Sequence, residues 1–311
     1  MRSVMLENRR TALRGALLAV ALLGIVPTAL AVEASGRSGF GIDAWWGEGD
    51  ARASQVYVPL SAELHSGEFA AGLSGAYVYT SRTAGPAGDA HMGTVVDTKL
   101  TTSYAVVDRL PVDLLLGLDF NLPTGETQLD RKELSLLMDP DLVSITTFGE
   151  GFNVNPVVTV AQAKGPVAVG FGVGYLWRGR YDLGADSGGQ DYDPGDIFNL
   201  TGEMHWAFAP EWKARVLASY ARYGTDKLDG EKVREEGKFL GLLAGVRRQW
   251  ERWDASVTAE ALFRGKSRSL DENGSLATDP ERGRGTEWKA TAATEYALNR
   301  ATRIGATATA L

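Results

Sequence analysis

The chain has 311 residues, a formal net charge of −7 at pH 7 and no cysteine. This acidic balance argues against a nucleic-acid partner, and the absence of cysteine excludes disulfides and thiolate chemistry. Its length and its 37 glycines fit one large β domain.

Residues 1–31 have the features of a secretory signal peptide. Four arginines lie within the first 14 residues, an apolar run covers 15–26, and Ala29 and Ala31 fit a small-residue cleavage site. A retained membrane anchor would need about 20 apolar residues. We therefore expect export, with a mature chain over residues 32–311.

The mature chain alternates apolar and polar residues with a period of two, which is typical of β-strands. Most of the alternating segments are long enough to cross a bilayer when tilted. The predicted strands are 39–46, 54–64, 68–80, 94–107, 112–122, 151–163, 167–178, 197–208, 212–223, 237–249, 253–265 and 287–298, with a thirteenth that starts at Thr302.

Short turns and long polar segments alternate along the whole series. The long segments are 47–53, 81–93, 123–150, 179–196, 224–236 and 266–286. Outer-membrane barrels sort their connections in this way, whereas a soluble sandwich has no reason to do so. The pattern predicts an all-β fold: a transmembrane, antiparallel, up-and-down β-barrel of 12 to 14 strands.

The thirteenth strand is an anomaly, because bacterial barrels close with an even number of strands. The chain also ends at Leu311, where barrel chains commonly end in an aromatic residue. A continuation of the protein beyond Leu311 is the simplest explanation. Closure with twelve or fourteen strands and irregular ends is the alternative.

The segment 167–178 shows the two predicted faces most clearly. Its odd positions carry large apolar residues from Val167 to Trp177, and positions 168, 170, 172 and 174 hold only Ala or Gly. We expect the large row to face lipid and the small row to leave space in the lumen. Tryptophans at strand ends predict interfacial belts, one with Trp212, Trp250, Trp253 and Trp288 and an opposite one with Trp45, Trp46, Trp177 and Tyr181.

The inward positions of the predicted strands carry many charged side chains, which need water or each other there. The predicted pore-lining residues are Asp97, Lys99, Asp113, Asp119, Glu203, His205, Lys213, Arg215, Arg247, Asp254, Glu260, Lys289 and Glu295. Acidic residues dominate the early strands and basic residues enter later, so opposed rows would orient polar solutes in a wet pore. The alternative is a ladder of internal salt bridges that plugs the barrel.

The longest connection, 123–150, contains a predicted short helix over 130–138. Asp130 is placed to cap it and Glu133 to complete a capping box, and Leu129, Leu134, Leu137 and Met138 give it an apolar side. The helix would either constrict the mouth of the barrel or decorate its surface. Within the strands, Pro59 and Pro156 each remove a backbone donor and predict a bulge or kink.

Two stretches, Leu114 to Glu126 with its "NLPTG" end and Phe148 to Asp182 with its "GEG" entry and Gly-alternating hairpin, resemble outer-membrane channels grouped with the meta-pathway of phenol degradation. These channels are similar to the hydrophobic and aromatic compound transporters of the outer membrane. The resemblance covers about a quarter of the chain. It implies a barrel that passes small, often hydrophobic or aromatic, molecules.

The residues give little support to catalysis. Only His65, His91 and His205 are available as bases, and His205 beside Glu203 is better interpreted as pore-lining. Four aspartates in 186–196 lack the calcium-loop order and predict a solvated acidic loop. We predict no enzyme, metal or cofactor.

The predicted function is a Gram-negative outer-membrane channel for passive uptake of small solutes, hydrophobic or aromatic ones. The alternative is a structural or adhesive barrel with an occluded lumen. The expected partners are outer-membrane lipid, lipopolysaccharide and the small-molecule solute, and the oligomeric state is left open.

Overall fold

The computed structural model describes residues 32–46, 52–85, 88–137, 143–184, 190–271, 274–279, 284–299 and 302–310. The predicted signal peptide, residues 1–31, lies outside these ranges. Among the residues described, no helix is long and apolar enough to cross a membrane.

The main sheet has 15 strands, as the period-two pattern leads us to expect. Its first half contains β1 (Glu33–Ser38), β2 (Gly41–Trp46), β3 (Arg52–Ser66), β4 (Phe69–Gly85), β5 (Gly88–Val95), β6 (Thr98–Val106) and β7 (Asp113–Leu122). Its second half contains β8 (Asn153–Lys164), β9 (Val167–Arg178), β12 (Ile197–Ala209), β13 (Trp212–Tyr223), β16 (Phe239–Trp250), β17 (Trp253–Arg264), β20 (Gly285–Ala297) and β21 (Arg303–Ala310).

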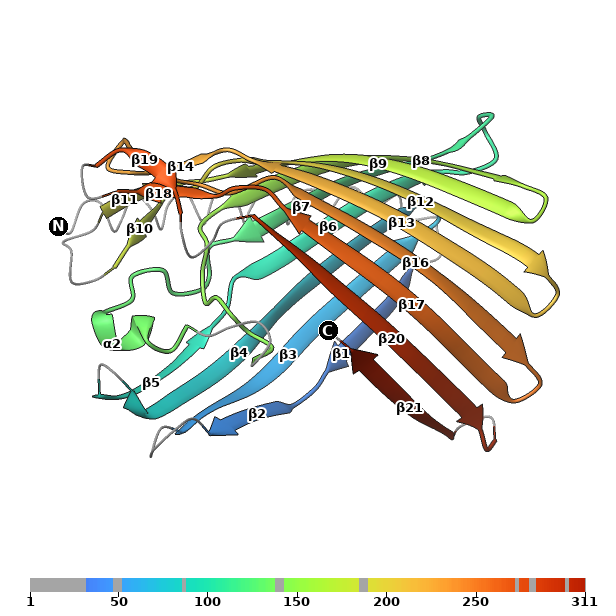
Figure 1. Ribbon diagram of the computed structural model, residues 1–311, viewed down its shortest axis with the longest axis horizontal. Helices are drawn as coiled ribbons and strands as arrows, with labels where there is room; N and C mark the ends of the chain where they lie inside the picture. The colour runs from blue at the N-terminus through green and yellow to red at the C-terminus, as the bar shows by residue number, and fades with distance from the viewer. Residues whose placement is uncertain are drawn as a thin grey trace. The chain divides into compact units, whose positions relative to one another are not determined.

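These strands are neighbours in the order in which they occur along the chain (Figure 1). The order is β1-β3-β4-β6-β7-β8-β9-β12-β13-β16-β17-β20-β21, with β2 beside β3 and β5 beside β4. With β2 and β5 off the path, 13 of the described strands remain on it. The prediction of an all-β, antiparallel, up-and-down fold with 12 to 14 strands is confirmed.

Four of the long segments predicted as polar loops contain strands. Segment 81–93 holds the end of β4 and most of β5, and the other three hold strands outside the main sheet. They form a second sheet of six strands, β10 (Tyr181–Leu183), β11 (Gln190–Asp193), β14 (Thr225–Leu228), β15 (Glu231–Glu235), β18 (Arg268–Leu270) and β19 (Leu276–Thr278). The β14–β15 hairpin turns at Asp229 and Gly230, whose φ angles are 51° and 85°. An Asp-Gly pair favours this kind of tight hairpin turn, so the sequence held a signal for a hairpin here.

The described residues fall into two compact units. Unit 1 takes those within 1–104, 118–154 and 179–191, and unit 2 takes those within 105–117, 155–178 and 192–311.

Unit 1 holds a small hydrophobic core in which the long connection packs on β4 and β5. Leu129, Leu136 and Phe148 from the connection are buried together with Val78 and Met92. The long connection is therefore packed on the sheet, and its predicted role as a constriction of the mouth stays a prediction.

The predicted helix is present but shorter than expected. Helix α2 covers Arg131–Leu134, and Asp130 and Glu133 form the predicted capping box. The buried residues differ from the predicted apolar side of the helix. Leu136, which follows the one-turn helix, is buried, whereas Leu134 and Leu137, predicted to lie on the apolar side, are 43% and 38% exposed. Met138 lies outside the described residues.

Pro59 does not produce the predicted bulge against β4, because the β3–β4 register runs unbroken past it. The irregularity lies on the opposite edge of β3, where β1 and β2 pair with it. β2 pairs with β3 only as far as Tyr57 and β1 begins to pair at Leu60, so the missing N–H of Pro59 faces a break between two short strands. Pro156 lies within β8, as predicted.

Candidate functional site

The sheet of unit 2 has one apolar and one polar face, which the strand register defines residue by residue. Directly opposed residues of an antiparallel pair lie on the same face. Phe171 opposes Gly202, and Val173 opposes Leu200, on the apolar face. The adjacent residues Gly170 and Glu203 oppose each other on the polar face.

The apolar face is exposed. Phe171, Val257 and Trp288 keep 52%, 62% and 64% of their surface accessible, and large apolar residues on every long strand of unit 2 behave alike. Soluble monomers rarely expose a contiguous apolar patch larger than a few hundred Å². The face therefore requires a non-aqueous environment or a partner.

Aromatic side chains gather at the end of the apolar face that carries the short turns. Trp253 lies 4.8 Å from Tyr296 and 6.3 Å from Trp250, measured between ring centroids. The guanidinium of Arg248 sits over the rings of Trp212 and Trp250, at 5.2 and 4.7 Å. Such a cluster of aromatic rings with a cation is typical of a membrane interface.

Trp288 does not belong to this turn-side belt, contrary to the prediction. It packs edge-on against Phe263, with ring centroids 6.1 Å apart, and the register places both at the end that carries the long connections. Trp177, at the end of β9, precedes a long connection as well. The sequence could have decided this, because the predicted strand 287–298 directly follows the long segment 266–286.

The polar face carries nine of the predicted pore-lining residues. They are Glu203, His205, Lys213, Arg215, Arg247, Asp254, Glu260, Lys289 and Glu295, brought to one face by the pairings of β12, β13, β16, β17 and β20. Sequence parity alone predicted this common face correctly.

The charges on the polar face are largely arranged in pairs. Glu203 Oε1 accepts hydrogen bonds from Arg215 Nε at 2.5 Å and stands 2.6 Å from His205 Nε2. Arg247 donates to Asp254 through both Nε and Nη2. The side chains stay partly accessible, with Arg215 at 48% and His205 at 55%, so the pairs lie at a wet surface and not in a packed core.

Further along the same face, Arg303 Nη1 lies 3.2 Å from Glu295 Oε2, and Lys289 stands directly across from Glu260 in the β17–β20 register. Lys213 and Arg247 oppose each other as like charges, and the Asp254 carboxylate beside Arg247 offsets the repulsion. His205, one of the three histidines considered as a base, is held in an ion-pair cluster with Glu203 and Arg215. Within the described ranges, no three acidic or histidine side chains are placed to hold a metal ion.

The row of small residues on β9 leaves open space on the polar face. A Cβ built on Gly170 would meet only Val160 O, at 3.8 Å, and one on Gly172 would meet the hydroxyls of Thr201 and Thr159, at 2.7 and 3.2 Å. These atoms belong to the neighbouring strands β12 and β8. Around Gly170, therefore, the polar face is hollow.

In unit 1, the predicted pore-lining residue Asp97 holds the long connection in place. It is 8% exposed and accepts hydrogen bonds from Asn121 Nδ2 at 2.5 Å, Gly125 N at 2.9 Å and Glu150 N at 2.7 Å. Both ends of the long connection are thus tied to one carboxylate. Asp97 lies between β5 and β6, and sequence parity could not show that the connection folds back over it.

The other early candidates have different surroundings. Lys99 is exposed and, with Asp97 and Pro59, lines a cavity of about 510 Å³ that Ser144 and Ile145 of the long connection also border. Asp113 Oδ1 accepts the backbone N–H of Asp108 at 3.2 Å, which stabilises the short turn before β7. Asp119 lies within β7 and is partly buried.

Gln55 is a functional candidate that the sequence did not single out. It is fully buried, donates from Nε2 to Ile145 O and accepts at Oε1 from Ile145 N, both at 2.9 Å. Its side-chain amide pairs with the backbone of Ile145 as a neighbouring strand would, and it holds the long connection on the polar face of β3. The sequence offered one signal for this role: Gln55 is an uncharged polar residue at an inward position of the predicted strand 54–64.

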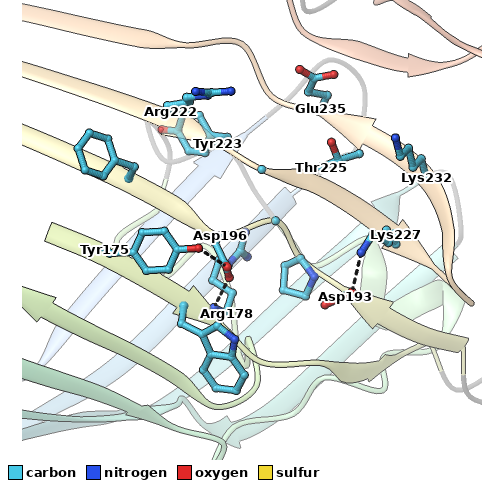
Figure 2. Close-up of a pocket in the computed structure, with 15 residues that line it drawn as sticks. Tyr175, Arg178, Asp193, Asp196, Arg222, Tyr223, Thr225, Lys227, Lys232 and Glu235 are labelled. Atoms are coloured by element: carbon cyan, nitrogen blue, oxygen red, sulfur yellow. Dashed lines mark hydrogen bonds and ion pairs between the residues drawn. The ribbon is translucent and has the colours of Figure 1, made fainter.

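Unit 2 also contains an open pocket of about 760 Å³ at the long-connection end of the apolar face (Figure 2). Tyr175 donates to Asp196 Oδ2 at 2.6 Å, and Lys227 Nζ lies 3.3 Å from Asp193 Oδ2. Two of the aspartates predicted as a solvated acidic loop are therefore bound within the fold. Asp186 lies outside the described residues.

No family model and no curated protein matches the chain. Among solved structures, an outer membrane channel from Pseudomonas putida is 12% identical with a TM-score of 0.43, over 91% of this chain and 96% of that one. OmpF from Salmonella typhi, in complex with daunomycin, is 11% identical with a TM-score of 0.38, over 88% and 87% of the two chains. The FrpB iron transporter from Neisseria meningitidis is 9% identical with a TM-score of 0.36, over 79% of this chain and 39% of that one. The resemblance to the phenol meta-pathway family stays a prediction.

Proposed function

We propose that the protein is an outer-membrane β-barrel that provides a passive channel for small solutes. The observation that carries this proposal is the pairing of faces in unit 2. The same strands carry an exposed apolar row on one side and an accessible charged row on the other. Lipid on the apolar side and water on the charged side would satisfy both rows.

The height of the apolar band supports the membrane environment. From Trp253 to Phe263, β17 advances ten residues, about 33 Å of extended strand. At the usual strand tilt of about 40°, this corresponds to about 25 Å along the membrane normal, the height of the apolar band of outer-membrane barrels. The rings of Trp253 and Trp288 mark its two edges.

In this proposal the charged residues of the polar face line the pore, and the glycines of β9 widen it. Alternating acidic and basic pairs impose a field that orients polar groups of a solute. The proposed cargo, small hydrophobic or aromatic compounds, rests on the resemblance of residues 114–126 and 148–182 to channels of the phenol meta-pathway group. Catalysis has no part in the proposal.

A second function, a non-transporting barrel with an occluded lumen, is favoured by one observation in unit 1. There the long connection packs on the same face of the sheet that carries Asp97 and Gln55. A connection fixed so firmly narrows the space above the polar face. Whether solutes still pass is a question for measurement.

Two measurements on the purified full chain test the proposal. Planar bilayers report single-channel conductance, and proteoliposomes report entry of benzoate against cyclohexanecarboxylate, which match in charge and nearly in size. Discrete conductance steps with faster entry of benzoate are expected for an aromatic-selective channel. Conductance steps with equal entry of the two solutes would support a channel but contradict its preference for aromatic compounds. Neither conductance nor flux beyond protein-free liposomes would favour the occluded barrel.

A further inference from the structure

We infer that the pocket at the long-connection end of the apolar face binds the phosphorylated headgroup of an outer-leaflet glycolipid of the lipopolysaccharide type. The inference rests on the proposed membrane location, because it needs the apolar face to lie in lipid. It does not depend on solute transport. It assigns a specific anionic site to a surface that otherwise contacts acyl chains.

The position of the pocket is the first argument. Tyr175, Phe198 and Arg222 lie side by side in the register of β9, β12 and β13, on the apolar face where its last residues give way to the second sheet. Tyr175 and Trp177 are nearly half exposed. A ring at this level contacts the boundary between acyl chains and headgroups, so a lipid phosphate would lie next to the pocket.

The charge of the lining is the second argument. Each acidic group is already engaged: Asp193 with Lys227, Glu235 with Arg268 Nη1 at 3.3 Å, and Asp196 with the Tyr175 hydroxyl and the Arg178 N–H. Arg222 and Lys232 are exposed, and neither has a hydrogen bond or ion pair to another described residue. Asp196 keeps its negative charge, because both of its partners are neutral donors. Four basic residues nevertheless line the pocket, Arg178, Arg222, Lys227 and Lys232, against Asp193, Asp196 and Glu235, and Glu235 is paired with Arg268, so the pocket carries an excess of positive charge.

The arrangement of the lysines is the third argument. Lys227 and Lys232 are directly opposed across the β14–β15 hairpin, and like charges in this position repel each other. In Figure 2 they stand on one side of the pocket and Arg222 on the other. A phosphate held among the three would relieve the repulsion and accept charge-assisted hydrogen bonds from each.

Native mass spectrometry of the full chain in detergent, with added bis-phosphorylated lipid A, tests this site. The double variant Arg222→Gln/Lys232→Gln should bind lipid A about tenfold more weakly or worse, whereas Arg222→Lys/Lys232→Arg should bind like the unmodified chain. The control is Lys164→Gln/Arg252→Gln, which removes two exposed charges from short turns at the other end of the strands. It should leave binding unchanged.

The source of the phosphate is resolved by two further arms. Lipid A stripped of both phosphates should lose the preference for the unmodified chain, and inorganic phosphate at millimolar concentration should not displace lipid A. Equal binding by the charge-removed variant and the control would overturn the site, as would equal binding of the stripped lipid. Displacement by inorganic phosphate would overturn the glycolipid assignment. Conductance of the same variants reports separately on the channel proposal.

Discussion

The side chain of Gln55 pairs with the backbone of Ile145 through two hydrogen bonds, each 2.9 Å long. The two residues are 90 positions apart in the chain, and the pair joins the long connection to the sheet of unit 1. Thr80 Oγ1 takes a third hydrogen bond from the same amide. With Gln55 and Thr80 fully buried, water does not compete for these groups.

Gln55→Ala should therefore lower the free energy of unfolding by about 2–4 kcal/mol, because both backbone groups of Ile145 lose their partner. Urea unfolding in detergent, followed by tryptophan fluorescence, measures the loss. The control is Gln162→Ala, which removes one exposed hydrogen bond to Pro111 O and should cost under about 0.5 kcal/mol. Limited proteolysis should cut 123–150 faster in the Gln55 variant only. Similar losses in the two variants would show that the buried pair is not an anchor.

Asp97→Asn separates a structural carboxylate from a pore charge. An asparagine keeps only one acceptor atom where three donors converge, so we expect a loss of about 2–4 kcal/mol in unfolding free energy with little change in ion selectivity. Lys99→Gln, on the exposed neighbour, should do the opposite and shift the reversal potential in a salt gradient. An Asp97 variant of normal stability but altered selectivity would restore this residue to the pore lining.

Val257→Arg tests whether the apolar face lies in lipid. An arginine near the middle of a lipid-facing strand costs about 2–4 kcal/mol, whereas at a 62% exposed position in water it would be nearly neutral. Thr258→Arg is the matched control, since its side chain points to the polar face of the same strand. Unfolding in lipid vesicles gives both values. A Val257→Arg variant as stable as the Thr258→Arg control would contradict the proposal that the apolar face lies in lipid.

Sequence parity predicted the strands and their faces because a long strand with one apolar and one polar face repeats one simple rule over ten or more residues. Glu203, Arg215, Arg247 and Asp254 all lie on the predicted common face. Parity could not predict contacts between the strands and the connections that fold back over them. The burial of Asp97 depends on residues 125 and 150 folding back over it, and no local pattern encodes that return.

The second sheet was missed for a related reason. Its strands have three to five residues each, too few for an alternating pattern to stand out. Asp229 and Gly230 were the strongest available signal for one hairpin. The pairing of that hairpin with β11 and β18 joins three connections that are far apart in the chain, so only the folded structure reveals it.

Arg247 and Asp254 provide a test of the charged face. Arg247→Gln leaves an unpaired carboxylate and should raise the preference for cations, and Asp254→Asn should lower it, because each change alters the fixed charge along a wet pore. The double variant should return near the original reversal potential. The accessible pair should contribute only about 0.5–1 kcal/mol to stability in a double-mutant cycle. Single variants without any effect on selectivity would place this face off the conduction path.

Gly170 and Gly202 offer the sharpest test of the channel, because they lie one register step apart on opposite faces of β9 and β12. A Cβ on Gly170 meets only one atom, at 3.8 Å, and a Cβ on Gly202 meets none within 4 Å, so a side chain can begin at either position without a clash at its Cβ. Gly170→Leu would project into the proposed pore, and Gly202→Leu into lipid.

We therefore expect Gly170→Leu to reduce single-channel conductance with little change in stability, and Gly202→Leu to leave conductance unchanged. Gly172 is unsuitable for this purpose, because a Cβ there lies 2.7 Å from the Thr201 hydroxyl and would disturb the fold. The comparison of Gly170 with Gly202 holds residue type, depth and added volume nearly constant. Equal conductance in the two variants would mean that the space over Gly170 is not on the conduction path, and the proposed pore lining at β9 would then be wrong.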